Sequence, residues 1–271
     1  MKRFKKLRAA LISAALFTAM TAGAQETDTL KGIEAYRAAL QDGNPAELWE
    51  MRGEEFWKTP RGPKKASLER CDLGKGAGVV KGAYVELPRY FADADKVMDL
   101  EQRLVHCMVT QQGLTVEEIT KRPFGSGSKT SDMEGLVAFI TGQSRGMLMN
   151  VQPKHPKEQL AYEQGRNIFF YRAGPHDFSC ATCHAEDGKR IRLQELPNLL
   201  NPKDAQRAYG SWPAYRVSQG EVRTMQHRLW DCFRQQRFPE PAYASDALTS
   251  LTMFLAKNAN GGTYDAPALK R

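Results

Sequence analysis

The sequence predicts a mainly α-helical, exported protein that is divided into two domains. Apolar residues recur at helical spacing along much of the chain, and a composition of 41% hydrophobic and 26% charged residues is typical of globular proteins. The amino terminus has the composition of a secretory leader. About 247 residues follow it, enough for two domains of ordinary size, so we place a boundary near residue 150.

Residues 1–24 form the predicted signal peptide. Five basic residues lie among the first eight positions, an apolar run extends to Met20, and Ala22-Gly23-Ala24 supplies a cleavage site before Gln25. The run is too short to cross a membrane, so we expect a soluble chain with no membrane span. Because the leader has no acidic residue, its removal lowers the net charge from +8 to about +3. Nucleic acid is therefore not an expected partner.

The first predicted domain, residues 25–150, contains helices joined by loops. Asn44 before Pro45 is typical of a helix start. The glycine-rich stretch 74–78 lacks the preceding strand and the Lys-Ser/Thr ending of a phosphate-binding loop. We expect it to fold around a cofactor or a disulfide instead. The predicted helices cover residues 29–42, 45–58, 96–112 and 133–142.

The most specific motif is Cys180-Ala181-Thr182-Cys183-His184. Two thiols separated by two residues can each join one vinyl group of a porphyrin, and the next histidine then lies under the iron. A thioredoxin-type redox pair is the main rival, and zinc needs two more ligands than this segment offers. In an exported chain the motif predicts one covalent haem c on Cys180 and Cys183, an axial ligand in His184, and a periplasmic location.

The second predicted domain, residues 151–271, has the pattern of a small helical cytochrome. In such proteins the first and last helices cross, and Gly165 and Phe169 offer a small and a large side chain for that contact. Ser245 is a suitable N-cap for the last helix, and Asn260-Gly261-Gly262 ends it. The predicted helices cover residues 159–172, 221–236 and 245–259.

The sixth ligand of the iron decides between an electron carrier and a catalyst. The candidates after His184 are a methionine, a histidine and a cysteine within one helical stretch, and a second methionine in the last helix that is more typical of core. Methionine is the usual ligand of a simple electron-transfer cytochrome. The candidates are Met225, His227, Cys232 and Met253.

The remaining cysteines bear on that choice. Of five cysteines, two are used by the haem, and pairing Cys71 with Cys107 closes a loop of 36 residues in the first domain. Cys232 is then left alone. A lone thiol in an exported protein is oxidised unless something occupies it, and iron can do so. The alternative is a buried, inert cysteine.

Arg228 lies four residues before Cys232, so both share one face of a helix. A guanidinium there favours the thiolate over the thiol and can bind a small oxyanion through paired hydrogen bonds. An exposed arginine on an arginine-rich helix is the alternative interpretation.

Several motifs together resemble one family over nearly all of the mature chain. The most discriminating is Arg228-Leu-Trp-Asp-Cys232, because generic cytochromes do not place arginine four residues before a cysteine where the methionine ligand should be. The others are Pro45–Trp49, Gly53–Trp57, Arg61–Lys64, Cys71–Gly76, Leu87–Phe91, Leu104–Cys107, Cys180–His184 and Trp212–Arg216. By these motifs the sequence resembles SoxA, the A subunit of the SoxAX cytochromes, which are the L-cysteine S-thiosulfotransferases of bacterial sulfur oxidation.

The resemblance implies two cytochrome c-like helical domains. One form of the family has a haem in each domain, and in the other the first domain has lost its haem and holds a cysteine pair. This sequence has no Cys-x-x-Cys-His in its first half. It therefore resembles the single-haem form, with a haem-less first domain and a disulfide between Cys71 and Cys107.

The resemblance also implies a mechanism. His184 and Cys232 would hold the iron, and Cys232 would be the reactive sulfur, able to carry an extra sulfur atom as a persulfide. Thiosulfate would bind Arg228 and join Cys232 in an oxidative step, before transfer to a cysteine of the SoxYZ carrier protein. A second small cytochrome, SoxX, would form a heterodimer with this chain and take the electrons.

Two alternatives stay open at the level of sequence. The first is a plain periplasmic electron-transfer cytochrome c with Met225 as the sixth ligand. The second is a non-catalytic scaffold subunit in which Cys232 forms a disulfide to a partner.

Overall fold

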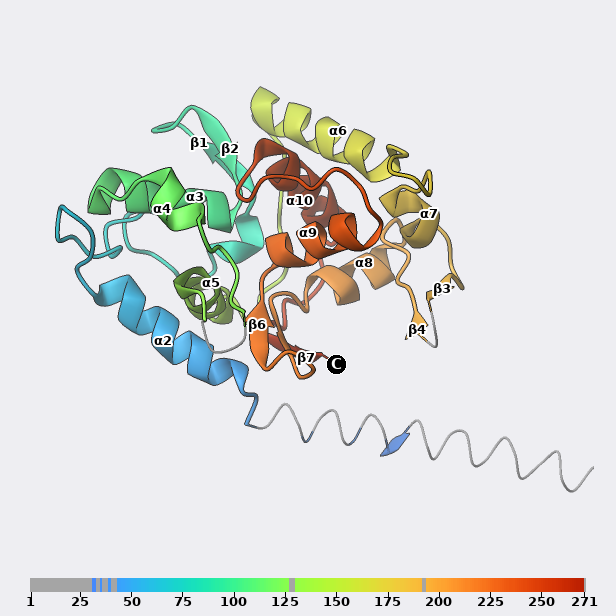
Figure 1. Cartoon of the computed structure of the whole chain (residues 1–271), viewed down its shortest axis with the longest axis horizontal. Coiled ribbons are helices and arrows are strands. Elements are labelled where there is room, and N and C mark those ends of the chain that lie inside the picture. Colours follow the sequence, from blue (N-terminus) through green and yellow to red (C-terminus); the bar gives the residue numbers. More distant parts are fainter. Residues whose placement is uncertain are drawn as a thin grey trace, which may run out of the picture. The chain divides into compact units, whose positions relative to one another are not determined.

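A computed structural model of the chain describes residues 43–126, 130–191 and 194–270, together with 31, 32, 35 and 39. Residues 45–271 form one compact unit (Figure 1). The predicted signal peptide lies outside the described residues, as does most of the helix expected over 29–42. Within the described part of the chain, no helix is long and apolar enough to cross a lipid bilayer.

Helices dominate both the first half of this unit, before about residue 150, and the second half after it, which confirms the predicted fold class. The first half contains α2 (Ala46–Lys58), η1 (Tyr84–Glu86), β1 (Arg89–Phe91), β2 (Lys96–Met98), α3 (Leu100–Cys107), the π-helical turn η2 (Met108–Gln112), α4 (Val116–Thr120) and α5 (Asp132–Gly142). The second half contains α6 (Pro156–Phe170), α7 (Cys180–His184), β3 (Arg190–Ile191), β4 (Gln194–Glu195), α8 (Pro202–Tyr209), β5 (Ala214–Arg216), β6 (Glu221–Arg223), α9 (Met225–Gln235), α10 (Asp246–Asn258) and β7 (Ala268–Lys270).

The second half is organised around the crossing of α6 and α10, which lie side by side (Figure 1). Gly165 permits this crossing, since a side chain there would collide with the backbone carbonyl of Ser250. One turn later, the ring of Phe169 packs 5.2 Å from that of Phe254, centroid to centroid. The predicted contact of a small and a large residue between first and last helix is thus confirmed.

Two predicted helices begin later than expected, for the same reason. The stretches beginning at 96 and 221 open as short strands, and each helix starts only after a capping residue in extended conformation. Asp99 accepts a hydrogen bond from the backbone of Gln102, and Thr224 accepts one from that of His227. Side-chain caps of this kind set the first turn of a helix. They define the starts of α3 and α9.

The predicted disulfide between Cys71 and Cys107 is present and buried. The glycine-rich loop follows it directly. Asp72 accepts hydrogen bonds from the backbone nitrogens of Gly74 (2.6 Å) and Gly76 (2.9 Å), so the loop wraps around a carboxylate next to the disulfide. The loop expected to fold around a cofactor or a disulfide thus lies beside the disulfide and folds around the Asp72 carboxylate.

One hydrophobic core runs through both halves of the compact unit. Tyr84 from the first half stacks on Tyr209 from the second, with ring centroids 6.5 Å apart, and lies 4.9 Å from the ring of Tyr264. The boundary near residue 150 stays a prediction.

Candidate haem and thiol site

The Cys-x-x-Cys-His motif forms the short helix α7, which packs against α6. A reciprocal capping box starts this helix: the Ser179 hydroxyl accepts from the backbone of Thr182 (3.1 Å), and the Thr182 hydroxyl accepts from the backbone of Ser179 (3.0 Å). The cap therefore uses a residue inside the motif, between its two cysteines. It holds Cys180 and Cys183 about one turn apart on the same side of the helix.

His184 ends α7 with its ring held by the backbone. The ring Nδ1 lies 2.9 Å from the carbonyl oxygen of Pro197. Because a carbonyl can only accept, Nδ1 carries the proton and Nε2 keeps a free lone pair. Burial lowers the pKa of His184, the Pro197 contact raises it, and the positive charge of Arg228 lowers it. The imidazole is thus neutral and oriented, which is what a metal ligand requires.

Three cysteines lie outside the disulfide, two on α7 and one on α9. Cys180, Cys183 and Cys232 are all unpaired and partly buried. Burial, with smaller contributions from the charges of Cys232 and Cys183, raises the pKa of the Cys180 thiol to about 12. The charge of Cys232, on α9, thus acts on a thiol of α7.

This donor set fits covalent haem c. α7 supplies two thiols at the spacing that porphyrin attachment requires and an imidazole with a free nitrogen, and α9 supplies a third sulfur. Cys180 and Cys183 would hold the porphyrin, and the iron would take its ligands from His184 and Cys232, as the sequence predicts.

Arg228 lies beside this group on α9. Its guanidinium carbon is 5.9 Å from the ring centroid of Trp212, its NH1 is 3.8 Å from a carboxylate oxygen of Asp231, and a third of its side chain is exposed. Burial raises the pKa of the Cys232 thiol, and Arg228 lowers it. The predicted influence of Arg228 thus has the expected sign but is smaller than the effect of burial.

Two further cations belong to the same region as Arg228. Lys270 Nζ lies 5.8 Å from the ring centroid of Trp212, and Arg216 is the register partner of Lys270 in the parallel pairing of β5 and β7. Burial lowers the pKa of Arg216, and so does the charge of Arg228, which is therefore close. Nothing in the sequence alone shows that Arg216 belongs to this region. Lys270 carries no signal either, because only the sheet brings the carboxyl end of the chain to this place.

The other candidate ligands lie elsewhere. Met225 is buried and lines a small cavity with Tyr84 and Tyr209, between the two halves. His227 packs edge-on against Phe124, 4.6 Å between ring centroids, and burial together with nearby Arg223 lowers its pKa to about 4. Met253 is fully buried in α10, as its pattern predicted.

Comparison with known proteins agrees with this geometry. The family model described as "SoxA/TsdA, cytochrome c domain" matches residues 52–149 and again residues 164–263. The chain is 52% identical to the L-cysteine S-thiosulfotransferase subunit SoxA of Hydrogenophilus thermoluteolus over 265 residues, covering 98% of this chain and 97% of that protein.

More distant relatives carry the same description. A SoxA subunit of Hydrogenobacter thermophilus is 33% identical over 228 residues, covering 84% of this chain and 82% of that protein. Among solved structures, the crystal structure of SoxXA from P. pantotrophus is similar with a TM-score of 0.70 and 25% identity. That match covers 88% of this chain and 84% of the other.

Proposed function

The chain belongs to the SoxA family of L-cysteine S-thiosulfotransferase subunits, and from that premise we propose that Cys232 is both an iron ligand and the sulfur that reacts with thiosulfate. The family assignment makes the protein a haem c subunit of the thiosulfate-oxidising Sox system. The observation that supports the residue assignment is the position of Arg228 and Cys232 one helical turn apart on α9. From there the charge of Cys232 acts on the Cys180 thiol, and the charge of Arg228 acts on the His184 ring.

The residues of α7 and α9 have distinct roles in this proposal. Cys180 and Cys183 would attach the porphyrin, and His184 Nε2 and the Cys232 sulfur would hold the iron. When bound, haem c supplies a redox centre and a positive metal charge beside the Cys232 sulfur. Burial raises the pKa of the Cys232 thiol, and the charge of Arg228 acts in the opposite direction, towards the thiolate.

Three cations of this region, Arg228, Arg216 and Lys270, could bind a small dianion. Arg228 lies one helical turn from Cys232, and Arg216 and Lys270 lie on the neighbouring sheet. A guanidinium can donate two hydrogen bonds to the sulfonate end of thiosulfate, which leaves the terminal sulfur free to face Cys232. Formation of the sulfur–sulfur bond from the Cys232 thiolate and thiosulfate releases two electrons, for which the expected partner cytochrome would be the acceptor. The resulting sulfane-sulfonate group then passes to a carrier thiolate by exchange.

The proposal also assigns partners and a compartment. A SoxX cytochrome is the expected heterodimer partner and electron acceptor, since the similar solved structure is a SoxXA complex. The SoxYZ carrier protein is the expected recipient of the sulfur group. The leader composition of residues 1–24 supports the periplasm as the location. The two matches of the family model support a domain boundary near residue 150.

Replacement of Cys232 by alanine tests the central assignment. We expect Cys232→Ala to keep the fold and the covalent haem, because neither attachment thiol is touched. Thiosulfate-dependent turnover with the carrier should fall at least about a thousandfold, since both the nucleophile and a ligand are lost. Intact mass, electron paramagnetic resonance of the ferric haem and steady-state turnover are the measurements.

The matched control is Met225→Leu, which removes the sulfur of the alternative ligand from the same helix. It should leave turnover and the resonance spectrum unchanged. A plain electron carrier predicts the reverse pattern, with normal properties in Cys232→Ala and lost ligation in Met225→Leu. That result would refute the catalytic assignment.

A further inference from the structure

The helix that carries Arg228 and Cys232 is held by the first half of the molecule. Gln226, in the first turn of α9, is 1% exposed and has every polar group of its side chain bonded. Its Nε2 donates to a carboxylate oxygen of Asp99 at 2.6 Å, and its Oε1 accepts from the backbone nitrogen of Ala244 at 2.9 Å. Its own backbone nitrogen donates to a Glu101 carboxylate oxygen at 3.2 Å.

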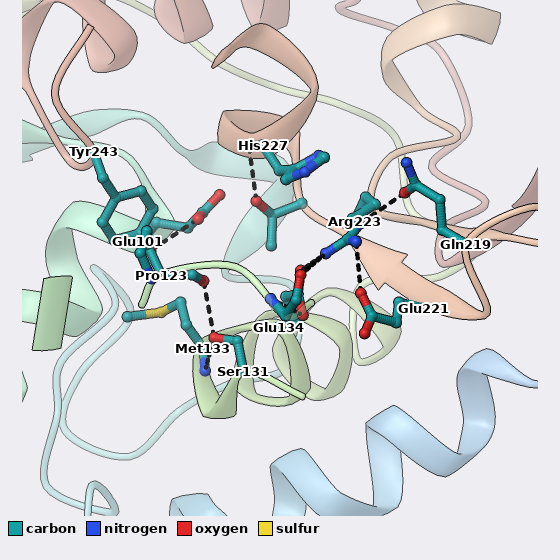
Figure 2. A network of polar contacts seen from close by, with 12 residues as sticks. Glu101, Pro123, Ser131, Met133, Glu134, Gln219, Glu221, Arg223, His227 and Tyr243 are labelled. Atoms are coloured by element: carbon teal, nitrogen blue, oxygen red, sulfur yellow. Dashed lines mark hydrogen bonds and ion pairs between the residues drawn. The ribbon is translucent and has the colours of Figure 1, made fainter. Parts of the chain in front are cut away.

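Asp99 and Glu101 are themselves held in place. The second carboxylate oxygen of Asp99 caps α3 by accepting from the backbone of Gln102 (2.8 Å). The second oxygen of Glu101 accepts from the hydroxyl of Tyr243 (2.9 Å), as Figure 2 shows. Both side chains are less than 5% exposed. Buried, fully bonded polar networks fix orientation, because any displacement leaves a polar group without a partner.

A second buried contact holds the strand just before α9. Arg223 donates to Glu134 on α5 and to the carbonyl oxygen of Gly125, each at 2.8 Å, and its NH2 lies 2.6 Å from Glu221 (Figure 2). Thr224, between this strand and the helix, caps α9. The start of α9 is thus bonded to the first half through Arg223 and through Gln226.

The anchored side chain and the reactive side chains point in different directions. Successive residues of an α-helix are rotated by about 100°, so Gln226 lies roughly opposite Arg228, whereas Arg228 and Cys232 are within about 40° of each other. One face of α9 therefore bonds to the first half. Another face carries Arg228 and Cys232.

We propose that Gln226, acting with Asp99 and Glu101, is a positioning residue that sets the orientation of α9 and so the distance of Cys232 from His184. This rests on the role proposed above for Cys232. In this proposal the first half of the molecule holds α9, the helix that carries Cys232, in a fixed orientation. Small displacements matter because a reacting group misplaced by about 1 Å can lose a hundredfold in rate.

A hydrogen-bond swap tests the proposal. Gln226→Glu places a carboxylate against Asp99, and Asp99→Asn places two amide donors against each other, so each single change breaks the pair. The double variant, Asp99→Asn with Gln226→Glu, restores it. The new asparagine donates to residue 226 and still accepts from Gln102, and the new glutamate accepts from Ala244. Fold and net charge are otherwise those of the parent.

The matched control is Gln112→Glu. Gln112 is equally buried and donates to the carbonyl of Ala66 at 3.1 Å, within the first half and away from α9. Loss of this hydrogen bond should lower stability without affecting the contacts that hold α9.

We expect each single variant of the Gln226–Asp99 pair to show a second low-spin species in the resonance spectrum, a turnover reduced about tenfold and faster amide hydrogen exchange in α9 than in α6. The double variant should return to within about threefold of the parent rate.

The outcomes separate this proposal from the proposed function. Folded single variants with parental spectrum and parental exchange in α9 would overturn the positioning role, as would a double variant no better than its parents. A parent protein without any sulfur–iron signature would instead overturn the role of Cys232. Exchange in α9 across the four proteins of the swap would then still decide whether Gln226 anchors the helix.

Discussion

Each half of the molecule contains a crossing of two helices with the same kind of contact, and the two halves differ in the groups that surround this crossing. In the first half α2 crosses α5 at Gly53, and in the second half α6 crosses α10 at Gly165. In each case a Cβ on the glycine would collide with a backbone carbonyl of the facing helix. An aromatic residue follows one turn later in both, with Trp57 against Phe139 and Phe169 against Phe254.

The difference lies in how each crossing is completed. The first half closes with a disulfide and a carboxylate-centred loop, whereas the second presents three unpaired cysteines and a histidine. The comparison teaches that this helical frame does not need a cofactor of its own in each copy. A covalent crosslink and buried hydrogen bonds complete the first half, which is then available to hold α9.

Removal of the disulfide should have the largest effect on this comparison. The double variant Cys71→Ala with Cys107→Ala frees a loop of 36 residues, which lowers the free energy of unfolding by about 4 kcal/mol in the chain-entropy model. Denaturant unfolding measures the loss. The haem resonance spectrum of the folded fraction should stay unchanged, since the crosslink lies in the first half. A loss below about 1 kcal/mol would show that the disulfide does not replace a cofactor's contribution.

The two glycines should show that the crossings are equivalent. Gly53→Ala and Gly165→Ala each force a methyl group into a backbone carbonyl, and we expect each to lower the free energy of unfolding by about 3 kcal/mol. Only Gly165→Ala should also alter the haem spectrum, because α6 packs against α7.

Gly135→Ala is the matched control within the same first-half crossing. Its Cβ would meet neighbours only at ordinary van der Waals distance, so the better helix propensity of alanine should leave stability unchanged or raise it. Equal losses at all three glycines would contradict the assignment of Gly53 and Gly165 as contact points.

The contact between the halves should depend on pH by a smaller amount. Burial raises the pKa of Glu134 to about 7, although Arg223 lowers it. The folded state then binds this proton more tightly than the unfolded state. Its contribution is complete below about pH 4.5 and is lost as pH rises towards 7. We expect the free energy of unfolding to fall by about 2 kcal/mol between pH 5 and pH 8.

Burial also raises the pKa of Glu101, to about 8, and this adds to the fall in the same direction. Glu134→Gln should reduce the slope, measured by denaturant unfolding at several pH values. Glu118→Gln should not, because hydrogen bonds from Thr115 lower the pKa of that carboxyl and it does not titrate in this range. An unchanged slope in Glu134→Gln would show that this carboxyl does not link the halves to pH.

The sequence predicted the helical content and the disulfide because these depend on local patterns or on cysteine number. The crossing at Gly165 was predicted from the likeness of the second half to small c-type cytochromes, in which the first and last helices cross. The sequence placed the starts of α3 and α9 several residues too early. Their apolar periodicity continues through the preceding strand, and the positions of the caps Asp99 and Thr224 depend on what the strands pair with. Lys270 and Gln226 carried no signal at all.

The sequence by itself determined which reactive groups are present. These are two thiols and an imidazole at the spacing that porphyrin attachment requires, and a third sulfur one helical turn from an arginine. Those relations are short in sequence, so helix geometry alone enforces them. Tertiary structure decided which face of α9 meets α7, which carbonyl orients His184, and which buried carboxylates hold Gln226. These contacts join residues more than a hundred positions apart in the last case, and only packing of the whole core brings such groups within bonding distance.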